Sequence, residues 1–229
     1  MPTFLIAYSP FWHAVTRLGE AQVMLPAALA LLLWLAHRPA ARLLVGWWLG
    51  MMVLATSITT ATKIAFIGYG FGWAPLNFTG ISGHAMFAAV VYPLLFLVLA
   101  LARPVGWQRA ALAAGYLLAL LVGISRVMVG AHSPSEVIAG LLLGGAASAA
   151  AITIAHTPAI RMPVWLPLGV IASVLVLGVN APPSRTHDLV TRISLALSGR
   201  SAPYTRREML RTWQQQQRGS QQGTPVVMR

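Results

Sequence analysis

Six long stretches of this chain contain no charged residue, and they constrain its fold more than any other feature. A helix needs about 17 to 25 residues to cross the hydrocarbon of a bilayer. The stretches are continuously apolar, without the alternation of a strand, and Leu and Ala dominate them. We therefore predict an all-α fold, a six-helix transmembrane bundle. The stretches are roughly Ala21–Ala36, Leu43–Thr62, Ala85–Ala102, Ala110–Ile124, Val137–Ala155 and Val164–Asn180.

Composition supports a membrane protein. Hydrophobic residues make up 57% of the 229 residues and charged residues only 9%, with a mean hydropathy of +0.71. A soluble domain carries about a quarter charged residues. The net charge of +12 indicates lipid head groups or topology signals in a membrane chain. The chain has no cysteine, which excludes disulfides, thiolate metal ligands and a cysteine nucleophile.

The sequence divides into three parts. Residues 1–20 are rich in aromatic residues and broken by Pro10, as expected of an N-terminal interfacial segment. Residues 21–183 hold the six apolar stretches, and their short connections predict antiparallel neighbours. Residues 184–229 form a polar, basic, Gln-rich C-terminal tail, which we expect to be partly helical and then disordered.

The polar residues at four of the helix ends are predicted to fall at one membrane face. Successive helices alternate in direction, so the end of the second helix meets the start of the third, and the end of the fourth meets the start of the fifth. This rim gathers a lysine, an arginine, two histidines and a carboxylate. The residues concerned are Lys63, Ser82, Gly83, His84, Ser125, Arg126, His132 and Glu136.

These residue types suit phosphate chemistry. Lysine supplies a compact cation and arginine a forked set of donors for phosphate oxygens. Two helix N-termini point their N–H groups and positive dipole ends at the same rim. A neutral histidine can attack phosphorus, a neighbouring carboxylate can hold its tautomer, and a second histidine can protonate the leaving oxygen.

Each residue also has a simpler explanation. Ser133-Pro134-Ser135-Glu136 has the pattern of a capping box, so Glu136 could serve only to cap the fifth helix. Lys63 and Arg126 could be snorkelling anchors at helix ends. A lone interfacial histidine is more often inert than catalytic. Their joint placement at one face favours the phosphate site.

With these residues identified, the chain resembles the phosphatidic acid phosphatase type 2 and haloperoxidase superfamily of metal-independent phosphatases. Its third motif, Ser-Arg, five residues, His, three residues, Asp, matches Ser125-Arg126, His132 and Glu136, with Glu in place of Asp. The second motif, Pro-Ser-Gly-His, matches 81–84 without its proline. The first, Lys, six residues, Arg-Pro, keeps Lys63 but has Gly70-Phe71 at the Arg-Pro position.

The resemblance implies a role for each matching residue. His132 would be the nucleophile that forms a phosphohistidine, Glu136 its orienting partner and His84 the general acid. No metal or other cofactor is implied. The missing first-motif arginine would have to be replaced by helix N-termini or by an arginine of the tail or a neighbouring segment, because 64–84 contains no Lys or Arg. The residues expected to hold the phosphate are Lys63, Arg126, Ser82, Ser125 and the Gly83 backbone N–H.

Charge in the short loops predicts the orientation. The arginines of the loops on the other face mark that face as cytoplasmic. The site would then face the periplasm, with the protein in a bacterial inner membrane. A rim site walled by apolar helices favours a lipid phosphate substrate, a monoester or a diphosphate, and membrane lipids as neighbours. The arginines concerned are Arg38, Arg42, Arg103, Arg109 and Arg161.

Three alternatives remain open from sequence. The chain could be a non-catalytic or repurposed membrane protein, for transport or assembly, that keeps the fold while its first motif decays. It could pass the phosphoryl group from one lipid to another, since a phosphohistidine can react with either acceptor. Nucleic-acid binding by the tail is the weakest, because its arginines are sparse and have few aromatic neighbours; we expect no nucleic-acid partner.

Overall fold

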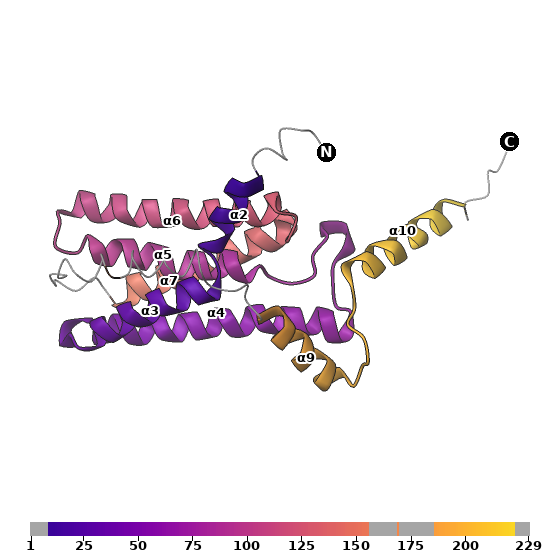
Figure 1. The fold of residues 1–229 in the computed structure, drawn as a ribbon, viewed down its shortest axis with the longest axis horizontal. Helices are drawn as coiled ribbons and strands as arrows, with labels where there is room; N and C mark the ends of the chain where they lie inside the picture. The colour runs from indigo at the N-terminus through magenta and orange to yellow at the C-terminus, as the bar shows by residue number, and fades with distance from the viewer. Residues whose placement is uncertain (1–8, 156–168, 170–185, 223–229) are drawn as a thin grey trace. The chain divides into compact units, whose positions relative to one another are not determined.

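The computed structural model describes residues 9–155, 169 and 186–222, and within them the chain is helical apart from turns and one isolated bridge, Trp73 to Phe78 (Figure 1). The all-α prediction is confirmed for this part of the chain. Two 3₁₀ turns, Pro39–Ala41 and Ala74–Leu76, accompany the helices. The helices are α2 Ser9–Arg17, α3 Ala21–Ala36, α4 Arg42–Tyr69, α5 Gly83–Leu99, α6 Val105–Met128, α7 Pro134–Ala155, α9 Thr186–Ser198 and α10 Arg206–Gln222.

The chain divides into two compact units. The first, here called the bundle unit, comprises Met1–Thr59 and Ile81–Ser184. The second, here called the tail unit, comprises Thr60–Gly80 and Arg185–Arg229. Helix α4 contributes its first part to the bundle unit and its last part to the tail unit. Each unit is described below by itself.

The prediction of six spanning helices is met in part. Among the described residues, four helical segments are long and apolar enough to cross a membrane: Pro10–Ala36, Pro39–Tyr69, Val105–Met128 and Pro134–Ala155. The third predicted span forms a shorter apolar helix, α5, of 17 residues. The sixth, Val164–Asn180, lies outside the described residues apart from Gly169. The long apolar helices of the described residues support a membrane protein, and the count of six spans is not confirmed.

Helix α5 is the centre of the bundle unit. Most of its side chains are buried, and it packs against α3, α6 and α7. Two glycines of α7, Gly140 and Gly144, lie against the backbone of α5; a Cβ on Gly140 would sit 2.7 Å from the Ser82 carbonyl oxygen. Ser148 Oγ donates a hydrogen bond to the Ala89 carbonyl at 2.8 Å. This close approach places the start of α7 beside the start of α5.

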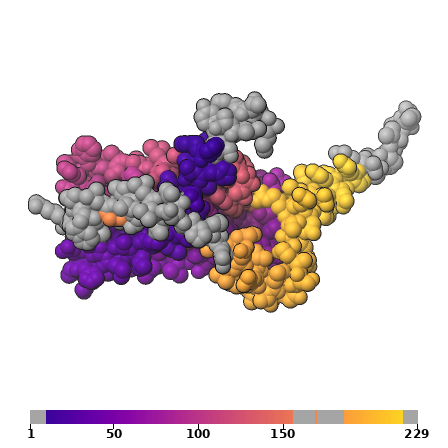
Figure 2. Space-filling model, in the orientation of Figure 1, coloured from indigo at the N-terminus to yellow at the C-terminus, as the bar shows by residue number. Residues whose placement is uncertain are grey.

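Helix α2 also belongs to the bundle unit. It packs against α6, as Figure 2 shows. The Tyr92 hydroxyl of α5 donates to the carbonyl of Leu18 at 2.7 Å, which fixes the turn between α2 and α3. The segment that the sequence indicated only as interfacial therefore contacts two helices that carry predicted site residues.

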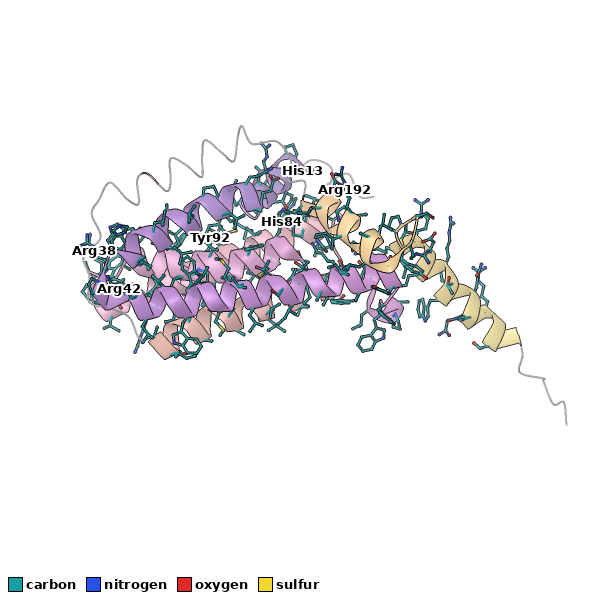
Figure 3. The ribbon with its side chains drawn as sticks, turned by 90° about the horizontal axis from the view of Figure 1, so that it is seen from below. His13, Arg38, Arg42, His84, Tyr92 and Arg192 are labelled. Atoms are coloured by element: carbon teal, nitrogen blue, oxygen red, sulfur yellow. The ribbon has the colours of Figure 1, made fainter. Side chains whose placement is uncertain are left out.

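The positions of the arginines in the bundle unit agree with the predicted separation of charge. Figure 3 shows Arg38 and Arg42 at one end of the helices, whereas His84 lies at the beginning of α5, toward the other end, with Tyr92 between them. Arg103 follows the far end of α5 from His84. Arg161 lies outside the described residues.

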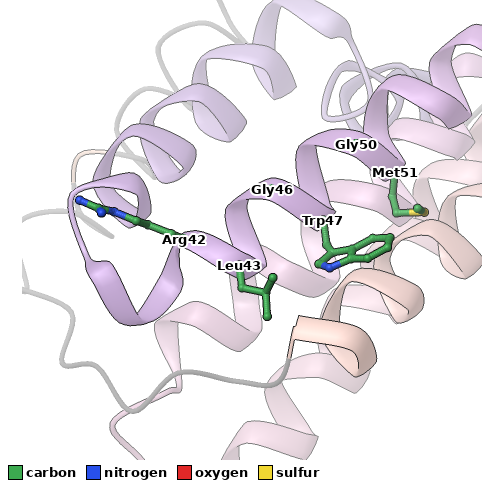
Figure 4. Close-up of a pocket in the computed structure, with 6 residues that line it drawn as sticks. All are labelled: Arg42, Leu43, Gly46, Trp47, Gly50 and Met51. Atoms are coloured by element: carbon green, nitrogen blue, oxygen red, sulfur yellow. The ribbon is translucent and has the colours of Figure 1, made fainter.

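A shallow apolar groove runs along α4 in the bundle unit (Figure 4). It forms because Gly46 and Gly50 bring no side chain to this face; a Cβ on either would meet nothing within 4 Å among the described residues. The groove is lined by no carboxylate, histidine or hydroxyl, so it is not a candidate for catalysis. Its other lining residues are Arg42, Leu43, Trp47 and Met51.

In the tail unit, the tail helices pack on the last turns of α4. The Tyr69 hydroxyl donates to the Leu197 carbonyl at 3.1 Å, and the Tyr204 backbone N–H donates to the Ile67 carbonyl at 2.9 Å. A Cβ on Gly68 would lie 2.9 Å from the Ser194 carbonyl oxygen, so α9 lies close to the α4 backbone here. The polar tail thus contains helices, and within the tail unit it contacts the C-terminal end of α4.

Candidate active site

The turn between α6 and α7 presents His132. Gly130 adopts a positive φ of 70°, which reverses the chain immediately after α6. The backbone N–H of His132 then donates to the Arg126 carbonyl at 3.2 Å. The turn therefore holds the histidine close to the last turn of α6, which carries the other half of the motif.

His132 is paired with Glu136. Its Nδ1 lies 2.7 Å from Glu136 Oε2, and the side chains are 16% and 0% exposed, respectively. An ionised carboxylate only accepts hydrogen bonds, so Nδ1 carries the proton and donates it. In the neutral imidazole the lone pair is then on Nε2. The contact orients the ring and leaves Nε2 on the side away from Glu136.

Glu136 also completes a capping box. Its Oε2 accepts a hydrogen bond from the Ser133 N–H at 3.1 Å, and its own N–H donates to Ser133 Oγ at 3.4 Å. The same carboxylate therefore caps α7 and contacts His132, as the two interpretations of Glu136 from sequence each require. One oxygen of Glu136, Oε2, contacts both the imidazole and the Ser133 N–H.

The start of α5 lies directly beside this pair. The backbone N–H of Ser82 donates to the Glu136 carbonyl at 3.1 Å. Ser82 Oγ is buried, makes no capping bond and has no hydrogen-bond partner among the described residues. A buried hydroxyl without a hydrogen-bond partner costs folding free energy, and its position at a helix N-terminus is typical of a site that binds an anion. Gly83 and His84 form the first turn of α5 at this place.

Arg126 is held by a residue that the sequence analysis did not identify. Its Nη1 donates to Thr16 Oγ1 of α2 at 2.7 Å, and Glu20 is close enough to attract its guanidinium electrostatically. Its Nε is buried and has no partner among the described residues. Ser125, by contrast, directs its hydroxyl proton to the Val122 carbonyl of its own helix at 2.6 Å.

The turn between α2 and α3 lies against His84. A Cβ on Gly19 would sit 3.0 Å from His84 Cβ and 2.6 Å from Val122 Cγ1, so only glycine fits here without displacement. The sequence signal for this contact was weak: a glycine next to Glu20, one of only four acids in the chain. The turn adds Thr16, Gly19 and Glu20 to the surroundings of the predicted site.

Lys63 belongs to the tail unit. The sequence placed the end of its helix near Thr62, whereas α4 continues to Tyr69 because residues 64–69 are also apolar or small. Lys63 is therefore inside a helix. The backbone of Gly80 packs on it: a Cβ at Gly80 would lie 3.1 Å from Lys63 Cγ.

The described histidines and carboxylates do not form a metal-ligand set: no three His, Asp or Glu of residues 9–155 and 186–222 lie together in such a group. The bundle unit thus brings together His132, Glu136 and Ser82 by hydrogen bonds and packs the Gly19 turn on His84. Arg126 joins them through the backbone of the α6–α7 turn.

Comparison with known proteins agrees with the motif assignment. The sequence model of the PAP2 superfamily matches residues 58–160, which include every predicted site residue. A Klebsiella pneumoniae protein, described as an uncharacterized 22.5 kDa protein in cps region, is 35% identical over 205 residues, covering 86% of this chain and 97% of that protein. The chain belongs to the PAP2 superfamily. No solved structure matches it. Membership of the PAP2 superfamily supports a phosphatase-type function in general.

Proposed function

We propose that this PAP2 superfamily member is a metal-independent hydrolase that removes a phosphoryl group from a lipid phosphate or lipid diphosphate at the membrane face. The observation that carries the proposal is the 2.7 Å contact between His132 Nδ1 and the fully buried Glu136 carboxylate. A buried carboxylate in this position stabilises the imidazolium that forms when the other ring nitrogen becomes bonded to phosphorus.

In the first step, His132 Nε2 attacks phosphorus, the bond from phosphorus to the leaving oxygen breaks, and His84 donates a proton to that oxygen. In the second step, water attacks the phosphohistidine, the P–N bond breaks, inorganic phosphate leaves, and His84 takes the proton from water. The charge on the phosphoryl oxygens is balanced by cations and by N–H and O–H donors. We assign this role to Lys63, Arg126, the Ser82 hydroxyl and the Gly83 N–H. The Ser125 hydroxyl donates to the Val122 carbonyl at 2.6 Å and would have to turn from it to bind phosphate.

The substrate class follows from the surroundings of the site. The motifs lie at the ends of apolar helices, so a phosphate head group can enter while its lipid tail stays in the bilayer. The short-loop arginines on the opposite face are cytoplasmic by the positive-inside rule, which directs the site to the periplasm of a bacterial inner membrane. Hydrolysis of a lipid phosphate there places the chain in lipid metabolism.

The test is to trap the intermediate. Purified full-length protein is mixed with ³²P-labelled phosphatidic acid or an isoprenoid diphosphate and quenched rapidly. We expect label on the protein, stable to base and labile to acid as a phosphohistidine is, and located at His132, together with release of inorganic phosphate. Label that passes from the protein to a second lipid, without released phosphate, would instead indicate transfer between lipids. Neither label nor release across the lipid panel would favour a non-catalytic membrane protein.

The contact between Thr16 and Arg126 gives a separate prediction. Thr16→Val removes the hydroxyl that accepts from Arg126 Nη1 but keeps the shape of the side chain. A hydrogen bond to a charged group contributes about 1.5–3 kcal/mol, so we expect kcat/KM for lipid phosphate to fall about tenfold or more. Thr16→Ser should restore it. The measurement is steady-state phosphate release.

Thr56→Val is the matched control, because the Thr56 hydroxyl only donates to Met52 of its own helix. We expect that control to retain the activity of the unmodified protein. Equal losses for Thr16→Val and Thr16→Ser would show that the hydroxyl of Thr16 does not position Arg126.

A further inference from the structure

The first motif has lost its arginine, and the tail unit shows what occupies that place. Gly70 stands at the arginine position, with a positive φ of 75° that disfavours any residue with a side chain. A Cβ on Gly70 would also lie 3.1 Å from the ring of Tyr204. Backbone conformation and packing therefore both disfavour an arginine at position 70, and the ring that packs there belongs to the tail.

The residues before and after Arg206 both contact the segment 67–72 of the tail unit. Before it, the Tyr204 N–H donates to the Ile67 carbonyl at 2.9 Å. After it, Met209 lies against Gly72; a Cβ there would be 2.6 Å from Met209 Sδ. These two contacts fix the residues between them against the chain that follows Lys63.

The start of α10 is also fixed locally. Glu208 Oε2 accepts from the Thr205 hydroxyl at 2.8 Å and from the Thr205 N–H at 2.9 Å. The Glu208 N–H donates to Thr205 Oγ1 at 3.3 Å, which completes a capping box. Hydrogen bonds from the Thr205 side chain and backbone lower the pKa of the Glu208 carboxyl below its usual value. Arg206 is the first residue of α10, so its side chain extends from a helix start whose conformation is fixed by this capping box.

The guanidinium of Arg206 is connected to Lys63 through two consecutive residues, Thr79 and Gly80. Its Nη2 donates to Thr79 Oγ1 at 3.1 Å, and Thr79 precedes Gly80 in the chain. Gly80, at a φ of 142°, packs on Lys63, with its Cβ position 3.1 Å from Lys63 Cγ and 3.3 Å from Lys63 Cα. Arg206 is half-buried, whereas the next residue, Arg207, is exposed. Both cations lie in the tail unit.

We propose that Arg206 supplies the cation that the first motif lacks and binds the phosphate of the substrate together with Lys63. The inference rests on the proposed function, which assigns Lys63 to phosphate binding. Arginine suits the role because its planar fork of donors can contact Thr79 and a phosphate oxygen at once. Under this proposal the tail contributes a phosphate-binding residue, and one of its arginines has a defined role.

The test is direct binding of inorganic phosphate, measured by calorimetry on the full-length protein in detergent. Arg206→Ala should weaken phosphate binding about tenfold or more, as expected for loss of a charge-assisted contact. Arg207→Ala is the matched control, with the same change of net charge at the adjacent exposed residue, and should bind as the unmodified protein does. Added guanidinium ion should partly restore phosphate affinity to Arg206→Ala, which a purely structural role would not allow.

Arg206→Gln keeps a donor for Thr79 but removes the charge, so it decides the matter if Arg206→Ala does not fold. Phosphate affinity unchanged in these variants, or equally weakened in Arg207→Ala, would overturn the inference, as would an unmodified protein that binds no phosphate. Lipid phosphate hydrolysis that depends on His132 but not on Arg206 would overturn only this inference. Phosphate binding that depends on Arg206, without any turnover, would overturn only the proposed function.

Discussion

Replacing His132 with alanine is expected to abolish the release of phosphate from lipid phosphates, lowering kcat by about a thousandfold or more, because the variant lacks the nitrogen that attacks phosphorus. The imidazole is oriented by a fully buried carboxylate and held at a tight turn. The measurement is phosphate release by purified protein, together with incorporation of ³²P into the chain, which should also disappear.

His37→Ala is the matched control for this experiment. His37 is exposed at the other end of α3, and its Nδ1 lies 2.7 Å from the Leu33 carbonyl oxygen of its own helix. This variant should retain the activity of the unmodified protein. Phosphate release by folded His132→Ala at the unmodified rate would falsify the assignment of the nucleophile.

Replacing Glu136 with glutamine separates the two roles of this residue. Glutamine can still accept the Ser133 N–H bond of the capping box, so the unfolding temperature should stay close to that of the unmodified protein. It cannot stabilise an imidazolium by charge, so kcat should fall by a factor on the order of 10² to 10⁴. The measurements are thermal unfolding followed by circular dichroism and phosphate release on the same samples.

Glu136→Ala is the comparison, since it removes both the cap and the charge and should lower stability and rate together. A glutamine variant with the unmodified rate would mean that Glu136 serves only to cap α7. A glutamine variant that loses rate and stability in parallel would mean that the carboxylate acts on catalysis only through the fold of the helix start.

The central pair of the site was predictable because its geometry is local. His132 and Glu136 are four residues apart across a helix start, the spacing of the family motif that implied their pairing, and the contact is present. Helix α3 was predictable for a similar reason: its bounds, Ala21–Ala36, coincide with those of the first apolar stretch. Continuous apolar runs leave few alternatives to a membrane helix.

The residues that surround the pair were not predictable, because their contacts join distant parts of the chain. Thr16 contacts Arg126, 110 residues later in the chain. Gly19, in the turn between α2 and α3, packs against His84 of α5. No periodicity or motif in 1–20 indicates either contact. Similarly, Arg206 reaches Thr79 across 127 residues, so the sequence could say only that a tail arginine was one possible replacement for the missing cation.

By itself, the sequence determined that the described part of the chain is helical and apolar, that the chain resembles the PAP2 superfamily chiefly through its second and third motifs, and that His132 and Glu136 share one helix start. These properties depend on apolar runs and on contacts within one helical turn, which are set by neighbouring residues. The tertiary structure alone decided that Thr16 holds Arg126, that Gly140 lets α7 lie against the start of α5, and that Tyr204 fills the place of the lost motif arginine. Such contacts depend on how closely separate backbones approach, and that distance is set by the packing of whole helices.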